Sequence, residues 1–361
     1  MALTQVQPGM LGTPQPYNFK NRIINGAMVI DQRNAGASVS TTAGGFNYTL
    51  DRWNYYASQA SKFTVQQNAG SVTPPVGFNN YLGVTSLSAY SVAVGDIFII
   101  DQCIEGFNTA DLGFGTANAK TITLSFQVYS SLTGTFGGSL MNSAFNRSYP
   151  FTYSVPVANT WTTISVTIAG DTSGTWIGAT NGIGIRLSFG LGVGSTYSGA
   201  AGSWSANQYY SATGATSIVG TNGATFYITG VQLEVGVTAT TFDYRSIGTE
   251  LALCQRYFVK IGGNFLYDCI FIGFYTDSVT FFASYPLPVT MRTTPTVASN
   301  ALYVDNGSGG GAVTALSVIA NQTNPQIGYI TATTTNGTLG RSANMRGNNS
   351  TSNYLSYSAE L

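Results

Sequence analysis

The side chains that most often carry out chemistry in proteins are scarce in this sequence. Histidine does not occur among its 361 residues, which removes the commonest general base near neutral pH and the commonest metal ligand. The three cysteines, Cys103, Cys254 and Cys269, are far apart and form no Cys-x-x-Cys pair. They therefore predict neither a disulfide framework nor a zinc site, and we expect them to be buried as small apolar side chains. The sequence predicts no cofactor.

The acidic residues offer a second route to chemistry. Among the 14 carboxylates, the closest grouping is Asp96, Asp101 and Glu105, which adjoins aliphatic strand-like runs. Two carboxylates that meet in space could act as the acid and base of a glycosidase. Enzymes that cleave long surface polysaccharides usually carry a β-helix, however, and no repeat of about 20–30 residues is present. We therefore expect a protein that is not an enzyme, with a glycan-degrading enzyme as the alternative.

Calcium is the metal that such a chain could hold. Asp31 lies near the start of the first β-rich region and Glu234 near its end. Two carboxylates with nearby backbone carbonyls would suit an ion that prefers oxygen ligands. The alternative is that each carboxylate caps a turn or is an ordinary surface charge. We expect no metal, and Asp31 and Glu234 are the candidates if calcium binds.

Two polar stretches contain the residue types that bind sugars. Aromatic faces pack on the apolar surfaces of sugar rings, while amide and guanidinium groups bond to hydroxyls. The alternative for each aromatic residue is packing in the core or between subunits. The candidates are Trp204, Asn207, Tyr209 and Tyr210 in the first stretch and Arg341, Arg346, Asn348, Asn349 and Tyr354 in the second.

The composition predicts the fold class. Charged residues make up 8% of the chain, against roughly 25% in ordinary globular proteins, and the net charge is zero. Glycine (43), tyrosine (22) and phenylalanine (20) are abundant. Aromatic and β-branched residues favour strands while Gly and Asn favour turns, so we expect an all-β protein. The zero net charge argues against a nucleic-acid partner, and the lack of a long apolar run argues against membrane insertion.

Residues 20–245 contain short strand-like runs separated by Gly, Ser, Asn and Thr, the first of them over residues 22–30. The runs 121–128 and 163–168 alternate apolar and polar residues with period two, which indicates strands with one buried face. Many such strands predict a two-sheet β-sandwich of the jelly-roll type.

Residues 259–361 return to strand-like runs and predict a second, smaller β-sandwich, which we call the head. The polar stretches 304–312 and 333–353 predict long loops in it. Between the two units lies a connector, residues 246–258, with a helix expected over 249–258. One stripe of this helix would either pack on the chain's own β domains or form the seam of a homotrimer; its residues are Leu251, Cys254 and Phe258.

The first 19 residues predict an extended arm. Pro8, Pro14 and Pro16 fix the backbone and withhold hydrogen-bond donors. The arm is either disordered or docked on a neighbouring protein. The side chains that docking would bury are Val6, Met10, Leu11 and Tyr17.

Several stretches of the sequence resemble a known family. They are Asn21-Arg22-Ile23-Ile24-Asn25-Gly26 with Asp31-Gln32-Arg33, then residues 48–53, 228–236 and 250–258, and at the distal end 288–297 and Ser358-Ala359-Glu360-Leu361. These segments are similar to those of bacteriophage tail-fibre proteins that carry a jelly roll like that of carbohydrate-binding modules. The resemblance implies a jelly roll followed by a head, a homotrimer, and a place in the virion.

Taken together, these features predict a structural and adhesive protein of a phage virion, made in the cytoplasm of the bacterial host. The arm, residues 1–19, would attach to other phage proteins. Loops on the β domains, above all those of the head, would bind a host surface polysaccharide. One alternative is a purely structural fibre or decoration protein on the phage head or tail, and a second is a glycan-degrading tailspike.

Overall fold

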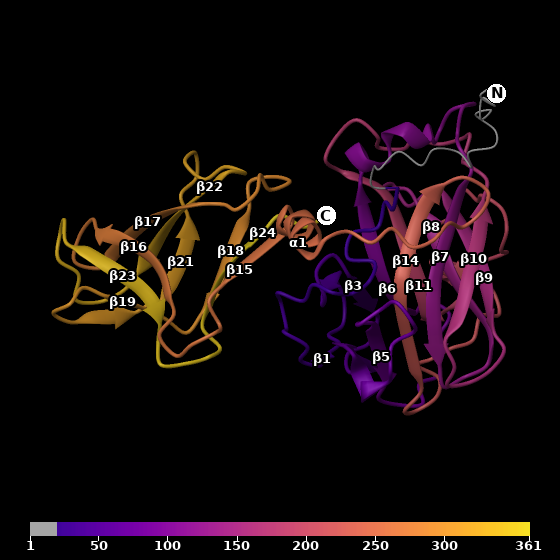
Figure 1. Ribbon diagram of the computed structural model, residues 1–361, viewed down its shortest axis with the longest axis horizontal. Helices are drawn as coiled ribbons and strands as arrows, with labels where there is room; N and C mark the ends of the chain where they lie inside the picture. Colours follow the sequence, from indigo (N-terminus) through magenta and orange to yellow (C-terminus); the bar gives the residue numbers. More distant parts are fainter. Residues whose placement is uncertain (1–19) are drawn as a thin grey trace, which may run out of the picture.

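The computed structural model describes residues 20–361. Up to residue 245 the chain forms two six-stranded antiparallel sheets that pack face to face (Figure 1). The first sheet has the order β1 (Val39–Ser40), β4 (Phe63–Gln67), β5 (Leu82–Ser86), β14 (Thr225–Val235), β7 (Ile122–Ser130) and β10 (Thr162–Ile168). The second has the order β2 (Asn47–Tyr48), β3 (Asn54–Ala57), β6 (Ile97–Glu105), β11 (Ile183–Val193), β8 (Gly134–Met141) and β9 (Ser148–Val155).

Short elements decorate this sandwich. Strands β12 (Ser198–Gly199) and β13 (Ser211–Ala212) pair in parallel. Single 3-10 turns are η1 (Ala69–Ser71), η2 (Gly106–Asn108), η3 (Ala110–Leu112) and η4 (Ser195–Tyr197).

One apolar core lies between the two sheets. Period-two alternation places Phe126 and its alternate neighbours of β7 inside, and the rings of Phe126 and Phe189 pack with centroids 5.0 Å apart. Trp53 is fully buried beside Phe189. The predicted all-β fold, a jelly-roll sandwich followed by a short helix and a second β unit, is confirmed. Within residues 20–361, no helix is long and apolar enough to cross a membrane.

The run over residues 22–30 is not the strand that the sequence predicts. It is an irregular segment packed against the sandwich, in which buried Asn25 has a φ of 58°. The Asn25 side chain donates to the Ile30 carbonyl (2.8 Å) and accepts from the Ile30 amide (3.0 Å). A Cβ on Gly26 would lie 2.2 Å from the Val231 carbonyl oxygen, so this position requires glycine. The segment is held by these side-chain bonds and by isolated backbone bonds to β14, from the Arg22 amide to the Leu233 carbonyl and from the Val231 amide to the Gly26 carbonyl (both 2.9 Å), without a continuous sheet ladder.

The connector holds α1 (Ile247–Gln255), and the head follows it. A three-stranded sheet has the order β15 (Phe258–Ile261), β24 (Tyr354–Ser358) and β18 (Thr296–Asn300). A seven-stranded sheet has the order β20 (Gly310–Ala312), β19 (Leu302–Asp305), β23 (Ser342–Gly347), β16 (Cys269–Tyr275), β17 (Thr280–Pro286), β22 (Ile327–Thr333) and β21 (Ala315–Val318). Of the two stretches expected to be long loops, 304–312 is partly taken up by β19 and β20, while 333–353 contains β23 with loops on both sides of it.

The helical stripe proposed as a trimer seam packs within its own chain. Cys254 is fully buried with Ile24, Ile30 and Tyr257, and Leu251 packs against this cluster. Phe258 is also buried, but it belongs to β15 and not to the helix, which ends at Gln255. The stripe therefore packs on the chain's own β domains, which was the alternative to a trimer seam.

The final residues of the sequence tie the head to the sandwich. Figure 1 shows the C-terminus beside α1, at the junction of the two units. Glu360 pairs with Arg33 (2.7 Å) and with fully buried Arg52. Arg292 donates both to the Glu360 carbonyl (2.6 Å) and to the Asn181 carbonyl (3.1 Å). The bonds of Glu360 to Arg33 and Arg52 and that of Arg292 to Asn181 join residues more than a hundred positions apart.

Candidate functional site

The face of the first sheet that is turned away from the core carries a cluster of four aromatic side chains. Tyr129 on β7 lies directly opposite Tyr227 on β14, with stacked rings 5.3 Å apart. Trp161 lies 5.5 Å from Tyr129, Tyr81 lies 5.0 Å from Tyr227, and Tyr81 and Trp161 are 5.6 Å apart, so the four rings form a closed cluster. Tyr81 and Tyr227 are buried, whereas Tyr129 and Trp161 are half-buried. Burial raises the pKa of Tyr81 and of Tyr227.

The next positions on this face are polar. On β7 and β10, Gln127 pairs in register with Thr163, and Ser125 pairs with Ser165. The Gln127 amide donates to the Thr163 hydroxyl (2.9 Å), and that hydroxyl donates to the Gln127 carbonyl oxygen (3.1 Å). Thr163 and Ser165 are exposed on β10, an edge strand of the sheet. These four side chains form what we call the polar floor.

Three aromatic rings rise beside the floor. Phe78 and Phe242 have centroids 5.1 Å apart, Phe242 and Tyr244 4.9 Å, and Phe78 and Tyr244 5.6 Å. The Tyr244 hydroxyl donates to the Gly77 carbonyl (2.8 Å), which joins the two segments that supply the rings. Tyr244 nevertheless keeps 58% of its surface exposed. We call this trio the aromatic wall.

A bulge in β14 makes room for the wall. The register of β14 against β7 shifts between Thr229 and Gln232, and Gly230 in the bulge has a φ of 61°. The Phe78 ring occupies the space of the missing side chain, since a Cβ on Gly230 would lie 2.5 Å from it. Bulges commonly re-aim the chain next to functional sites.

The loop that carries Phe242 and Tyr244 is fixed by two side chains of β14. The Glu234 carboxylate accepts bonds from the Thr240 amide (2.8 Å) and the Thr240 hydroxyl (2.7 Å). The Gln232 carbonyl oxygen accepts from the Asp243 amide (2.8 Å). The closing strand therefore positions the wall that follows it in sequence.

Floor and wall border a groove of about 520 Å³. An aromatic wall beside hydroxyl and amide groups is the combination that holds a sugar ring by its apolar face and its hydroxyls. A second hollow of about 180 Å³ touches the same three rings and also Asn21, Asp243 and Glu250. The side chains and backbone that line the groove belong to Phe78, Ser125, Phe126, Gln127, Thr163, Ile164, Ser165, Gly230, Ala239, Thr240, Thr241, Phe242 and Tyr244.

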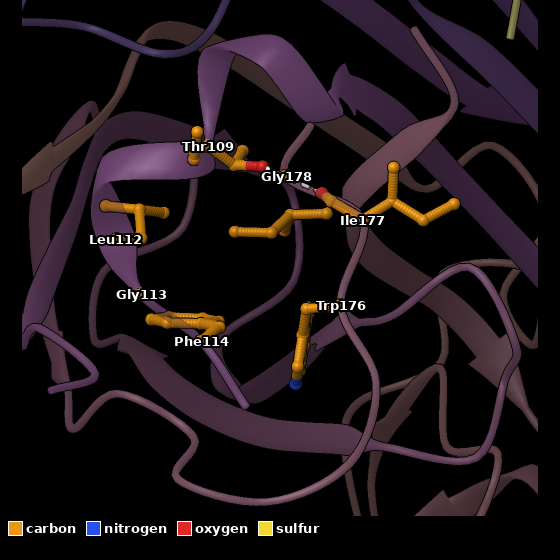
Figure 2. Close-up of a pocket in the computed structure, with 9 residues that line it drawn as sticks. Thr109, Leu112, Gly113, Phe114, Trp176, Ile177 and Gly178 are labelled. Carbon is orange, nitrogen blue, oxygen red and sulfur yellow. Dashed lines mark hydrogen bonds between the residues drawn. The ribbon is translucent and has the colours of Figure 1, made fainter. Parts of the chain in front are cut away.

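A smaller cavity lies at the rim of the sandwich. Figure 2 shows Phe114 and Trp176 on one side of it and Thr109 on the other. It holds about 40 Å³, and the Thr109 hydroxyl is already bonded to the Ile177 carbonyl (3.3 Å). A space of this size suits a water molecule and not a sugar.

The first set of predicted sugar-binding residues does not converge on one site. Trp204 packs on Trp176 (5.3 Å) and its indole donates to the Ala169 carbonyl (2.7 Å). Tyr210 is buried in another cluster, Tyr209 is half-buried against Gly199, and Asn207 is exposed. The aromatic members are therefore mainly packed against protein.

The second set gathers in part. The Arg346 guanidinium bonds to the Asp305 carboxylate (3.0 Å) and lies 5.1 Å from the Tyr267 ring. The Tyr267 hydroxyl donates to Asn349 (2.9 Å), so Arg346 and Asn349 meet around one tyrosine. Arg346 belongs to strand β23 and not to a loop. The remaining candidates are exposed Arg341 and Asn348 and half-buried Tyr354.

The carboxylates of the two calcium candidates accept hydrogen bonds from nearby backbone amides. Asp31 caps a turn by accepting bonds from the amides of Asn34 (2.9 Å) and Gly36 (2.7 Å), and Glu234 fixes the Thr240 loop. Among residues 20–361, no group of three or more His, Cys, Asp or Glu side chains could hold a metal ion.

Two of the cysteine predictions hold and one fails. Cys103 and Cys254 are buried as expected, whereas Cys269 is exposed. Cys269 begins β16 where the register against β23 shifts, so its side chain escapes the core. The predicted attachment residues of the arm lie outside the described part of the chain.

The carboxylates considered for catalysis are each engaged separately. Asp96 accepts a bond from Tyr90 (3.0 Å), Asp101 pairs with Arg186, and Glu105 pairs with Arg256 (2.5 Å). Burial raises the pKa of Asp101 although Arg186 opposes this effect. None of the three lines the groove.

Residues of the groove escaped the sequence prediction, although a signal was present. The alternation over 121–128 and 163–168 already marks Ser125, Gln127, Thr163 and Ser165 as the outward face of two strands. The sequence does not reveal that these strands are neighbours, or that Phe78 stands beside them.

No protein-family model matches this sequence, and no curated protein matches it. Among solved structures, the enzymatically active domain of tailspike protein 4 of bacteriophage CBA120 is similar at 11% identity and a TM-score of 0.31, over 60% of this chain and 22% of that chain. A CBM4 structure is similar at 14% identity and a TM-score of 0.28, over 59% and 98% of the chains. The family 11 carbohydrate-binding module of Clostridium thermocellum, in complex with a β-1,3-1,4-mixed-linked tetrasaccharide, is similar at 11% identity and a TM-score of 0.28, over 56% and 97%. These likenesses are remote, and the chain spans less than a quarter of the tailspike.

Proposed function

We propose that this protein binds carbohydrate in the groove on the outer face of the first sheet. The observation that carries the proposal is the placement of the exposed Tyr244 ring and its two aromatic neighbours beside a floor of hydroxyl and amide groups. Binding sites of this kind usually lie on a rigid scaffold, and here both sides of the groove are fixed to one sheet. The site belongs to the jelly roll and not to the head, where receptor contact was first expected.

We further propose that the carbohydrate is a host surface polysaccharide and that the protein is a tail fibre of a phage virion. The support is the sequence resemblance to phage fibre proteins, which includes residues 228–236. Gly230, Gln232 and Glu234 of that segment shape the aromatic wall. In this proposal, copies of the chain form a homotrimer and residues 1–19 attach it to other phage proteins.

A purely structural role in an assembly is a second candidate, favoured by one observation. The seven-stranded sheet of the head exposes Ile272 (72%) and Phe274 (45%), and Phe282 and Tyr329 continue this patch at centroid distances of 5.5 and 5.7 Å. Exposed apolar patches of this kind commonly mark protein interfaces.

Binding of the purified chain to a glycan array, followed by titration of the best ligand, tests the carbohydrate proposal. Tyr244→Ala removes the most exposed ring of the wall and is expected to weaken binding about tenfold, which corresponds to about 1.4 kcal/mol. Phe107→Ala is the matched control, because Phe107 is 57% exposed and does not line the groove.

The outcomes separate the candidates. Loss of affinity in Tyr244→Ala with parent-like affinity in Phe107→Ala supports the groove. Equal affinity in all three proteins would place the ligand elsewhere, and the failure of the parent chain to bind any glycan would leave the structural role. Release of reducing sugar by the parent protein would instead show a glycan-degrading enzyme.

A further inference from the structure

We infer that the ligand of this groove is a neutral oligosaccharide and that the Gln127–Thr163 pair selects it through its hydroxyl groups. This inference rests on the carbohydrate function proposed above and adds the chemical class of the ligand. It also names the side chains that would distinguish one sugar from another.

The lining of the groove consists of neutral groups. Ser125, Ser165 and Thr163 present hydroxyls from the floor, and Thr240 and Thr241 also line the groove. A hydroxyl donates one hydrogen bond and accepts others, which matches the hydroxyl groups of a sugar. The aromatic wall offers ring faces that carry partial negative charge, so they suit C–H surfaces and repel carboxylates.

Charged side chains that bond to the loop lining the groove are themselves held by that loop. The Lys20 ammonium donates to the Thr241 carbonyl (2.7 Å), and the Lys20 amide donates to Asp243 (3.0 Å). Glu234 is held by Thr240. These charges of both signs fix the loop that carries the wall, so they give the groove no strong field of one sign that would attract an ion.

The Gln127 and Thr163 side chains are already held in place to form hydrogen bonds with ligand hydroxyls. Each partner bonds to the other across neighbouring strands, at 2.9 and 3.1 Å. A glutamine amide has two N–H groups, and one of them suffices for this contact, which leaves the second for a ligand. Because the pair is held by two strands, a ligand need not order these side chains, and binding costs less entropy.

The experiment uses an array of gluco-, manno- and galacto-oligosaccharides together with acidic counterparts that carry uronic or sialic acids. We expect neutral oligosaccharides to bind with an affinity that changes by less than about twofold when the salt concentration is raised about tenfold. Thr163→Val removes the hydroxyl but keeps the shape and strand preference of the residue, and should weaken binding by about tenfold.

Thr152→Val is the matched control. Thr152 is an exposed threonine on β9, an edge strand of the other sheet, just as Thr163 is on β10. Parent-like affinity in Thr152→Val, together with the loss in Thr163→Val, supports the inference. Unfolding midpoints of both variants close to that of the parent would show that neither substitution disturbs the sandwich.

The outcomes distinguish this inference from the proposed function. If acidic glycans bind to the parent protein and Tyr244→Ala weakens that binding, the ligand is not a neutral oligosaccharide, while the proposed carbohydrate binding in the groove stands. Neutral glycans that bind equally to the parent and to Thr163→Val would overturn the role of the pair. If no glycan binds, or if Tyr244→Ala has no effect, the groove itself is wrong and both proposals fail.

Discussion

At the scale of single residues, the ion pair between Arg52 and Glu360 is a buried contact of the junction. Arg52 is fully buried, lies 3.6 Å from the centroid of the Tyr257 ring, and donates to the Cys103 carbonyl (2.6 Å). Burial disfavours the cation, but Glu360 together with Tyr257 and its other neighbours outweighs burial, and the pKa of Arg52 lies above its ordinary value. Removing the partner would leave a buried charge uncompensated.

We therefore predict that Glu360→Gln lowers the free energy of unfolding by about 3 kcal/mol, measured by chemical denaturation. Asp111→Asn is the control. It breaks the Arg22–Asp111 pair, whose acid is 46% exposed, and should cost less than about 1 kcal/mol. Similar losses in the two variants would mean that the buried pair is no stronger than a surface pair.

At the scale of elements, the residues that follow α1 are joined to the end of β6. Arg256 and Tyr257 both bond to the Glu105 carboxylate at 2.5 Å. Burial opposes the ionisation of Glu105, but the bonds from Arg256 and Tyr257 prevail and hold its pKa below the ordinary 4.5. The folded state therefore binds this proton less readily than the unfolded chain does.

The stability of the folded protein therefore depends on pH through Glu105. Ionised Glu105 stabilises the fold above pH 4.5, and this contribution is lost as the pH falls through its lowered pKa. We predict that Glu105→Gln is less stable than the parent at pH 7 and loses less stability on acidification below pH 4.5. Denaturation midpoints measured across this pH range check it, and parallel curves for the two proteins would contradict it.

The comparison of the parent protein with Glu105→Gln separates the contribution of Glu105 to stability from that of Asp51. Burial raises the pKa of Asp51 from 3.8 to about 6, although Arg33 and Gln32 oppose it. Its contribution to stability is therefore present below pH 3.8 and lost as the pH rises through about 6, the opposite direction to Glu105. This term is common to both proteins and cancels in the difference.

At the scale of the whole molecule, the question is how copies associate. Because the Leu251 stripe packs within its own chain, we predict that Leu251→Asp lowers the melting temperature without changing the molar mass measured by light scattering. Ile247→Asp is the control on the same helix, since Ile247 is 62% exposed, and it should change neither quantity.

Other outcomes would revise this view. A fall in molar mass for Leu251→Asp would restore the stripe as a seam between copies. A fall for Ile247→Asp alone would place the contact at the exposed first turn of α1. The homotrimer itself stays a prediction, and a monomeric parent protein would contradict it.

Local patterns in the sequence determine the fold class and the order of units. Period-two alternation over 121–128 and 163–168 marks β7 and β10, because successive side chains of any strand point to opposite faces. Local patterns likewise predict the helix after the first β unit and the strands beyond it. Residues 22–30 mislead because their apolar side chains suit a strand, while a buried asparagine and a glycine under a carbonyl impose an irregular course.

The groove was decided by tertiary structure alone. Its floor joins β7 to β10, and its wall joins Phe78 to Tyr244, which is more than 160 residues away in sequence. Strand order depends on which distant segments pair, and alternation within one strand carries no information about its neighbours. The sequence by itself therefore determined that Gln127 and Thr163 face outward on strands, since this needs only the pleat of each chain segment. That they face each other beneath an aromatic wall follows from long-range pairing, which exists only in the folded molecule.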